Sequence, residues 1–410
     1  MKDGTSMKVG IMGHGVVGSG VAKILMDNAE LIQARVGEPV EICKILELRD
    51  FDVPYAHLFT KDSKAVTEDP QIDIVVECMG GVEPAFSFSC DALRHGKHVV
   101  TSNKELVVAK GSILESLATD RNVNYLYEAS VGGGIPIVRP LQHCLSANRI
   151  GRIAGILNGT TNYILTRMQR EGIDFQEALQ EAQLLGYAER NPEADVQGYD
   201  AKRKICILAH VAFGSELDDS QISCHGITHI TNRDFVYASE LGMCIKLLAV
   251  AVNTANGYYA YVGPTLLPAN HPLSVANDVF NAIMVTGDMV GDTMFYGRGA
   301  GTLPTASAIC ADIIDCAWHV KGRKAALSHS LHQQALSPDN GMNSYLLRVL
   351  GNDVQTALEV FKGARIVRLA GVEDEFALIT PQEKAKDIEA KRVSLSKKAT
   401  ILQCMYVLDH

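Results

Sequence analysis

The 410-residue sequence predicts an α/β protein with three parts: a parallel-sheet domain, an α+β domain and a small C-terminal module. Three observations predict this fold class. Short apolar runs alternate with helical patterns before Ile150, which is typical of a parallel sheet with helical crossovers. The pattern after Ile150 is mixed, and the last segment follows the order β-α-β-β-α-β. The expected domain boundaries are 1–149 joined by about 305–325, then 150–304, then 342–410.

The first predicted strand, residues 7–12, leads into Gly13-His14-Gly15-Val16-Val17-Gly18 and a helix to about Asn28. This G-x-G-x-x-G pattern between strand and helix is typical of a Rossmann-type dinucleotide-binding domain. Gly13 permits the tight turn, Gly15 lets a pyrophosphate approach the backbone, and Gly18 lets helix and strand pack closely. The helix N-terminus, which begins with Val16 and Val17, supplies N–H groups to the phosphates.

The end of the second predicted strand, Val40–Leu48, carries groups that distinguish NAD from NADP. A carboxylate such as Glu47 would bind the ribose 2′-OH of NAD, whereas Arg49 would accept the 2′-phosphate of NADP. Both side chains also fit an ordinary solvated strand end. Because both kinds of group are present, the sequence leaves the choice between NAD and NADP open.

Further candidates for the cofactor site follow the next strands. The strand Ile72–Val76 leads to Gly80, and the strand His98–Thr101 leads to Ser102 and Lys104. Ligands of open parallel sheets bind outside the carboxyl ends of the strands. We therefore expect these residues near the dinucleotide, although Lys104 also fits a plain surface lysine.

The second half of the chain is predicted from its patterns as a mixed domain. Residues 158–163 open a helix after a strand, and its first N–H groups could hold a carboxylate. The segment Asn281–Asp292 alternates, which indicates an antiparallel pair. The helix Thr305–Val320 is expected to pack against the first domain. The other predicted elements are strands Arg152–Leu157, Ile245–Val252 and Tyr258–Leu266, and helices Asp174–Leu185 and Tyr199–Phe213.

The segment Ala182–Lys204 concentrates acidic and basic residues. On the helix predicted after Gly198, Asp200 and Lys204 stand four residues apart, so their Cβ atoms lie roughly 5–6 Å from each other. A lysine steered by a carboxylate at a buried helix edge is suited to proton transfer. A surface ion pair is the alternative. The carboxylate-rich loop ahead and the apolar helix behind favour the proton-transfer interpretation.

The same segment contains, in this order, Ala182, Gly186, Asn191-Pro192, Asp195, Gly198, Asp200 and Lys204. These residues resemble the signature of homoserine dehydrogenases, with every spacing met. Two further blocks are similar, TSNKELVVAK at 101–110 and the glycine-rich turn at 297–301 with the residues that follow it. The resemblance implies hydride transfer between NAD or NADP and the pair homoserine/aspartate 4-semialdehyde, in aspartate-family amino-acid biosynthesis.

The resemblance also implies roles for individual residues. Lys204 donates the proton to the aldehyde oxygen, Asp200 orients it, and Lys104 stabilises the developing alkoxide. The amino-acid substrate is expected to contact Glu189, Asp195 and Tyr187, and its carboxylate to contact Gly159 and Thr160. Arg49 is a candidate for NADP. Gly301 is a candidate for the nicotinamide end, where a tight strand-to-helix connection is the alternative. A monovalent cation, Na or K, is implied at Glu128, Val131, Gly133 and Ile135, where a glycine-rich hinge is the alternative.

The C-terminal order of elements resembles the small ligand-binding (ACT) domain of many homoserine dehydrogenases. Where such domains usually carry Asp-x-Pro-Gly, this chain has Gly351-Asn352-Asp353-Val354, so effector binding, dimerisation and a vestigial role all stay open. The resemblance implies a homodimer or homotetramer. Residues 322–342 are expected to be a linker. The predicted elements are 344–350, 354–361, 364–369, 376–380, 383–395 and 401–408.

Composition narrows the class of protein. The net charge of -9 disfavours nucleic acid as a partner, and no apolar run reaches the roughly 18–20 residues of a membrane span. Ten scattered cysteines and no secretory leader predict a cytoplasmic protein with reduced thiols. Two other functions stay open: a semialdehyde dehydrogenase that forms a thioester on Cys78 or Cys144, and a regulatory NAD(P)-binding protein without turnover.

Overall fold

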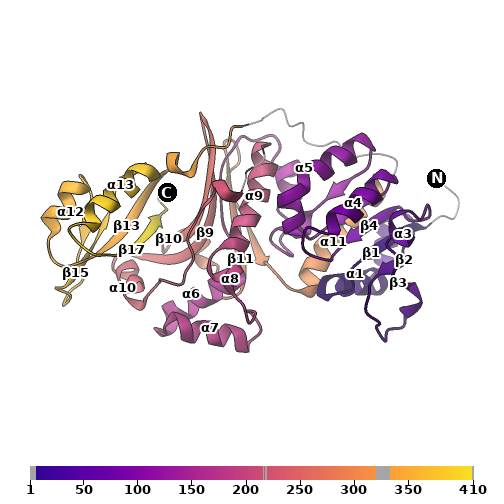
Figure 1. The fold of residues 1–410 in the computed structure, drawn as a ribbon, viewed down its shortest axis with the longest axis horizontal. Helices are drawn as coiled ribbons and strands as arrows, with labels where there is room; N and C mark the ends of the chain where they lie inside the picture. The colour runs from indigo at the N-terminus through magenta and orange to yellow at the C-terminus, as the bar shows by residue number, and fades with distance from the viewer. Residues whose placement is uncertain (1–5, 216, 218, 320–332, 409–410) are drawn as a thin grey trace. The chain divides into compact units, whose positions relative to one another are not determined.

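The structure is a computed structural model that describes residues 6–215, 217, 219–319 and 333–408. The chain divides into two compact units (Figure 1). Unit 1 comprises Met1–Ala147 and Gly297–Leu331, and unit 2 comprises Asn148–Tyr296 and His332–His410. Among the described residues, no helix is long and apolar enough to cross a membrane.

Unit 1 contains a six-stranded parallel sheet with the strand order β3-β2-β1-β4-β5-β6. The chain runs outward from β1 in one direction and from β4 in the other. The carboxyl ends of β1 and β4 therefore form the switch point where such sheets bind ligands. The strands are β1 Met7–Met12, β2 Val40–Leu46, β3 Phe59–Thr60, β4 Ile74–Glu77, β5 His98–Thr101 and β6 Tyr125–Leu126.

In unit 1, helix α11 packs with α1 and α2, and helix α4 packs with α5. Helix α1 buries Val21, Ala22 and Leu25 in one core with α11, although some 275 residues separate the two helices in the sequence. The helices are α1 Val16–Asp27, α2 Ala29–Val36, α3 Lys64–Thr67, α4 Ala85–Arg94, α5 Lys104–Asp120 and α11 Thr302–Trp318, with short turns η1 Ala56–Leu58, η2 Glu128–Ser130 and η3 Pro140–Cys144.

The predicted boundaries of several elements in unit 1 were wrong. Strand β4 is Ile74–Glu77 instead of Ile72–Val76. Strand β2 ends at Leu46 instead of Leu48, because Glu47 turns to bind backbone N–H groups. Helix α11 begins at Thr302 instead of Thr305, because Gly301, with φ of 124°, places the turn earlier. Its predicted last residue, Val320, lies outside the described residues.

Unit 2 is organised around an eleven-stranded sheet with the order β12-β11-β7-β9-β10-β17-β13-β15-β14, to which β8 and β16 attach at the side. Strands β11 and β12 are neighbours joined by residues 288–290, a connection short enough only for antiparallel strands, so this predicted pair is confirmed. The strands up to residue 298 are β7 Ile150–Ile156, β8 Ser223–Cys224, β9 Met243–Thr254, β10 Gly257–Pro268, β11 Phe280–Gly287 and β12 Gly291–Arg298.

Five helices pack on this part of the sheet or on one another. Helix α9 has the predicted bounds and buries Ile205 and Leu208 against β9 and β10. The helices are α6 Gly159–Glu171, α7 Phe175–Leu184, α8 Glu193–Val196, α9 Tyr199–Phe213 and α10 Asn232–Glu240, with short turns η4 Asp219–Gln221, η5 Pro272–Val275 and η6 Pro338–Asn340.

The C-terminal segment continues the same sheet. Strand β17 pairs in parallel with β10, with Tyr406 opposite Thr265. The rings of Tyr261 and Tyr345 lie 4.1 and 5.0 Å from the ring of Tyr406, within one hydrophobic core that runs from Ala154 to Leu408. The elements are β13 Met342–Leu350, α12 Val354–Val360, β14 Arg365–Val367, β15 Glu375–Ile379, β16 Glu383–Lys384, α13 Ala385–Ser396 and β17 Ile401–Val407.

About half of the expected linker, residues 322–342, falls outside the described residues. In the part of it that the structure describes, Ala335 forms a β-bridge with Tyr258 on β10. The predicted order β-α-β-β-α-β is present in the described residues that follow, with the two-residue strand β16 in addition.

Candidate active site

The glycine loop between β1 and α1 has the geometry of a phosphate cradle. Gly13 has φ of 95°, and a Cβ on Gly18 would lie 2.0 Å from the carbonyl oxygen of Gly13, so both positions require glycine. A Cβ on Gly15 would meet nothing within 4 Å, which leaves open space beside the backbone. Val16 is exposed and Val17 packs on the core at the first turn of α1. These residues fit a dinucleotide pyrophosphate.

The end of β2 is tied to this loop by Glu47. Its carboxylate accepts hydrogen bonds from the backbone N–H of His14 at 3.0 Å, and from those of Leu48 and Arg49. Arg49 forms two further bonds to the same carboxylate. The Arg49 guanidinium, together with the backbone N–H groups of Arg49 and His14, lowers the pKa of Glu47 to about 2. Glu47 is therefore ionised throughout the neutral range.

His14, which lies between the first two glycines of the motif, contributes its ring to the surroundings of the glycine loop. Its ring is buried and meets Phe51, Tyr55 and Phe59 edge-on, at centroid distances of 4.9–5.7 Å. Burial lowers the pKa of His14, so the ring is a neutral aromatic wall beside the glycine loop. The three aromatic residues after β2 were the available signal for this wall.

The other cofactor candidates in unit 1 follow β4 and β5. Gly80 has φ of 83° just after β4, and Ser102 and Lys104 follow β5. Asn103 joins the two segments, because its Nδ2 donates to the carbonyl of Gly81 at 2.6 Å while its Oδ1 caps helix α5. Lys104 is half-buried in the first turn of that helix.

The glycine-rich segment after β6 packs against the residues that lead into α11. A Cβ on Gly133 would lie 2.6 Å from the carbonyl oxygen of Gly299, two residues before Gly301. The Glu128 carboxylate accepts hydrogen bonds from the backbone N–H groups of residues 137, 138 and 139. Among the described residues, no group of three or more His, Cys, Asp or Glu side chains has the arrangement of a metal site. A cation here therefore requires mainly carbonyl oxygens, such as those of Val131, Gly133 and Ile135.

The acid–base pair of unit 2 is buried. On α9 the Nζ of Lys204 lies 2.7 Å from Oδ2 of Asp200, and it also donates to the carbonyl of Leu157 at 2.7 Å. The side chains are only 10% and 7% exposed, which distinguishes this pair from a surface ion pair. Gly198 has φ of 82° and lets the helix begin directly before the pair.

Asn158 is a central residue that the sequence analysis did not single out. Its Nδ2 donates to Asp195 at 2.7 Å and to Asp200 at 2.9 Å, while its Oδ1 accepts from the N–H of Thr161 and caps α6. One amide thus joins two carboxylates to a helix N-terminus. Burial raises the pKa of Asp195. The position of Asn158 directly before Gly159-Thr160 is typical of an N-cap residue. That position does not show that Asn158 also joins the two carboxylates.

The candidate substrate-binding residues of unit 2 differ in how closely they are joined to the rest of the structure. Gly159 opens α6 where a Cβ would lie 2.7 Å from the carbonyl oxygen of Val279. Thr160 donates to the carbonyl of Tyr187 at 2.6 Å, so the loop and the helix N-terminus are joined. Glu189 belongs to the same loop but is exposed, and its carboxylate forms no hydrogen bond or ion pair with any described residue.

The cysteines do not fit a thioester mechanism well. All ten are free. Burial raises the pKa of Cys78 strongly and that of Cys224 to about 11, which disfavours the thiolate that such chemistry needs. Cys144 is exposed, on the turn η3.

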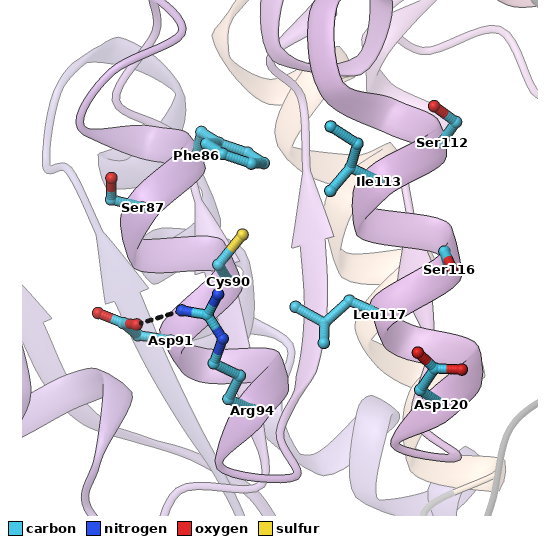
Figure 2. Close-up of a pocket in the computed structure, with 10 residues that line it drawn as sticks. All are labelled: Phe86, Ser87, Cys90, Asp91, Arg94, Ser112, Ile113, Ser116, Leu117 and Asp120. Atoms are coloured by element: carbon cyan, nitrogen blue, oxygen red, sulfur yellow. Dashed lines mark hydrogen bonds and ion pairs between the residues drawn. The ribbon is translucent and has the colours of Figure 1, made fainter.

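A separate groove lies between α4 and α5 (Figure 2). Phe86 and Cys90 face Ile113 and Leu117 across it, and a rim ion pair joins Asp91 and Arg94 at 3.2 Å. None of the candidate site residues lines this groove.

Comparisons with known proteins agree with these features. Residues 13–128 match the family model described as the NAD binding domain of homoserine dehydrogenase, and residues 136–314 match the one described as homoserine dehydrogenase. The homoserine dehydrogenase of Synechocystis sp. is 46% identical over 317 residues, which are 76% of this chain and 73% of that protein. That of Lactococcus lactis is 35% identical over 98% of this chain and 95% of its own length.

Solved structures give the same result. The crystal structure of a homoserine dehydrogenase from Thiobacillus denitrificans has a TM-score of 0.91 and 34% identity, with 99% of both chains covered. A hyperthermophilic archaeal homoserine dehydrogenase in complex with NADPH has a TM-score of 0.65 and 26% identity, and it covers 76% of this chain and 98% of its own.

Proposed function

We propose that this chain, which belongs to the homoserine dehydrogenase family, catalyses the NAD(P)-dependent interconversion of L-homoserine and L-aspartate 4-semialdehyde. The observation that carries the proposal is the buried Lys204–Asp200 pair, held by Asn158 at the N-terminus of α6. The bound dinucleotide supplies or accepts the hydride. The glycine loop, together with Gly80, Ser102, Lys104 and Gly301, is proposed to hold it.

Proton transfer is assigned to Lys204. In the reducing direction the aldehyde carbon gains a hydride and its oxygen gains the ammonium proton of Lys204, which yields the primary alcohol. Asp200 and the carbonyl of Leu157 fix the direction of this ammonium group. Lys104 stabilises the negative charge that develops on the oxygen.

The substrate zwitterion is proposed to bind through both of its charged groups. Asp195 and Glu189 bind its ammonium group, with Tyr187 beside them. The N–H groups of Gly159 and Thr160, at the N-terminus of α6, bind its carboxylate. The support for this arrangement is that Asn158 and Thr160 tie the carboxylates and the 187–195 loop to the same helix end.

Substitution of Lys204 by alanine tests the proposal. We expect kcat to fall by roughly 10²–10⁴, the range for loss of a general acid, in an assay that follows the absorbance of the reduced nicotinamide. The control is Lys202→Ala, which removes a lysine from the same helix whose partner is Asp219. Near-normal turnover of a folded Lys204→Ala variant would remove Lys204 from the mechanism. NADPH binding by the wild-type chain without oxidation on addition of aspartate semialdehyde would favour a regulatory protein.

We also infer a monovalent cation, Na or K, at Glu128, Val131, Gly133 and Ile135. The support is that the Glu128 carboxylate is engaged by backbone N–H groups, so carbonyl oxygens are the groups suited to binding. Replacement of all Na and K in the assay buffer by a bulky organic cation is expected to lower activity. Unchanged activity would contradict the site.

We propose a cytoplasmic homodimer or homotetramer. Its support is strand β12 at the end of the unit 2 sheet, where Tyr296 is 49% exposed, together with the turn before this strand, where Met289 is 83% exposed. An edge strand with exposed apolar side chains is a ready partner for a second copy. The C-terminal module is proposed to be an ACT-like domain with a structural role, because its strand β17 is bonded into the sheet of residues 148–296. Light scattering of the purified chain tests the assembly.

A further inference from the structure

We infer that Glu47 makes this enzyme select NAD over NADP, with Arg49 acting as a partner of Glu47 and not as a receptor for a 2′-phosphate. The inference deepens the proposed function and rests on it, because it assumes that the glycine loop binds a dinucleotide. Four observations carry it.

The first observation is the position of Glu47. It follows β2 directly, and β2 is the parallel neighbour of β1, whose end forms the glycine loop. The Oε2 atom of Glu47 accepts the backbone N–H of His14, which lies between the first two glycines. A carboxylate at this strand end is the group that binds the ribose hydroxyls of NAD.

The second observation is that the carboxylate is held by the backbone. Three N–H groups, from His14, Leu48 and Arg49, donate to it at 3.0–3.1 Å, and its side chain is only 9% exposed. These contacts fix both the place and the negative charge of Glu47. A 2′-phosphate at the adjacent ribose would meet this charge at close range, and like charges repel.

The third observation concerns Arg49. Its Nε lies 3.1 Å from Oε1 of Glu47 and its second terminal nitrogen lies 3.0 Å from Oε2, so the positive charge is neutralised by Glu47. The guanidinium also lies 5.2 Å above the ring of Phe51. The Arg49 side chain is 66% exposed, so it can move aside at small cost. Glu47 then keeps three backbone donors and has acceptor capacity for a ribose hydroxyl.

The fourth observation is the charge balance of the neighbouring residues. Lys61, the cation that follows β3, lies 3.2 Å from Asp50. Arg49 and Lys61, the two described cations that these ion pairs place after β2 and β3, are thus each matched by a carboxylate. These two pairs supply no net positive charge to attract a phosphate dianion.

Equilibrium binding separates this inference from catalysis. NADH and NADPH are titrated into the purified full-length chain, and the nicotinamide fluorescence gives each Kd. We expect the wild type to bind NADH at least about tenfold more tightly than NADPH. Glu47→Gln keeps the side-chain size and removes the charge, and we expect it to lower this ratio by about 10- to 100-fold, mainly by tightening NADPH.

The matched control is Asp52→Asn, which removes one exposed negative charge from the loop after β2 and is expected to leave the ratio within about threefold of wild type. Glu47→Asp, which retains the charge but shortens the side chain, is expected to keep the preference for NADH. If Glu47→Gln does not fold, the wild-type ratio and Glu47→Asp still decide.

The outcomes distinguish the inference from the proposed function. If both dinucleotides bind but the wild type prefers NADPH or shows no preference, the inference is overturned and the proposed function stands. The same holds if Glu47→Gln folds and leaves the ratio unchanged. If neither dinucleotide binds the wild type, the proposed function itself fails.

Discussion

Substitution of Asn158 by aspartate tests whether one amide holds the acid–base pair in place. Asn158 donates to Asp195 at 2.7 Å and to Asp200 at 2.9 Å, and it caps α6 through its Oδ1. Aspartate is as good an N-cap as asparagine, so the helix start is preserved. The substitution removes only the two donated hydrogen bonds and adds a carboxylate among carboxylates.

The magnitude follows from these contacts. Each hydrogen bond to a charged group contributes about 1.5–3 kcal/mol, so the two together contribute about 3–6 kcal/mol. The new charge adds repulsion, which the cluster relieves by binding a proton. If about half of the lost hydrogen bonding, about 1.5–3 kcal/mol, is expressed in the transition state, kcat/KM falls by roughly 13- to 160-fold.

The assay is kcat/KM for homoserine across pH, with Asn158→Ser as the comparison. Serine also caps the helix but adds no charge, so at roughly pH 8 we expect Asn158→Asp to be the slower variant. At lower pH the added carboxyl is protonated and the two variants should converge. Wild-type kcat/KM for Asn158→Asp would show that Asn158 is only a helix cap and would refute the bridge.

Three further substitutions follow from buried charges. Arg348→Met should lower the unfolding free energy by about 3–5 kcal/mol in urea titrations, because buried Asp234 loses its cation and buried Glu375 keeps only its pair with Arg233. A loss below about 1 kcal/mol would contradict this. Burial lowers the pKa of Lys246 from 10.5 to about 8, so the unfolded chain binds more protons between these values and stability should rise with pH there; Lys246→Met should abolish the rise. Burial raises the pKa of Asp195, so ionisation of this side chain costs stability as the pH rises through that pKa. Asp195→Asn should therefore be more stable than the wild type at roughly pH 8 and equally stable in strong acid. The KM of this variant for homoserine should be higher.

The sequence predicted those features whose causes are local. Helix α9 has its predicted bounds, Tyr199–Phe213, because Gly198 and Gly214 both adopt the left-handed conformation at its ends. The i,i+4 spacing of Asp200 and Lys204 brought their side chains together as expected. The glycine loop was predictable for the same reason, since its turn and its close contacts involve residues a few positions apart.

Contacts between distant segments could not be predicted in this way. The pairing of β17 with β10 joins residues some 140 positions apart, and neither strand carries a pattern that specifies its neighbour. The Asn158 bridge meets Asp195 and Asp200 only after β7, α8 and α9 have packed. Glu47 and Arg49 were noticed together, but their sequence could not show that the two charges neutralise each other.

The difference between local and long-range contacts matters most for the charged residues of the site. A sequence shows which residues are charged, but it does not show which partners surround each charge. The chemistry of a charged side chain depends on those partners. Lys204 and Arg49 are both cations two to four residues from a carboxylate, yet the first pair is buried and the second has an exposed guanidinium. Burial makes the Lys204 pair costly to separate, so it can hold a proton in a fixed direction. Exposure makes the Arg49 pair easy to separate, so only the backbone-bound carboxylate, Glu47, keeps a defined place beside the cofactor loop.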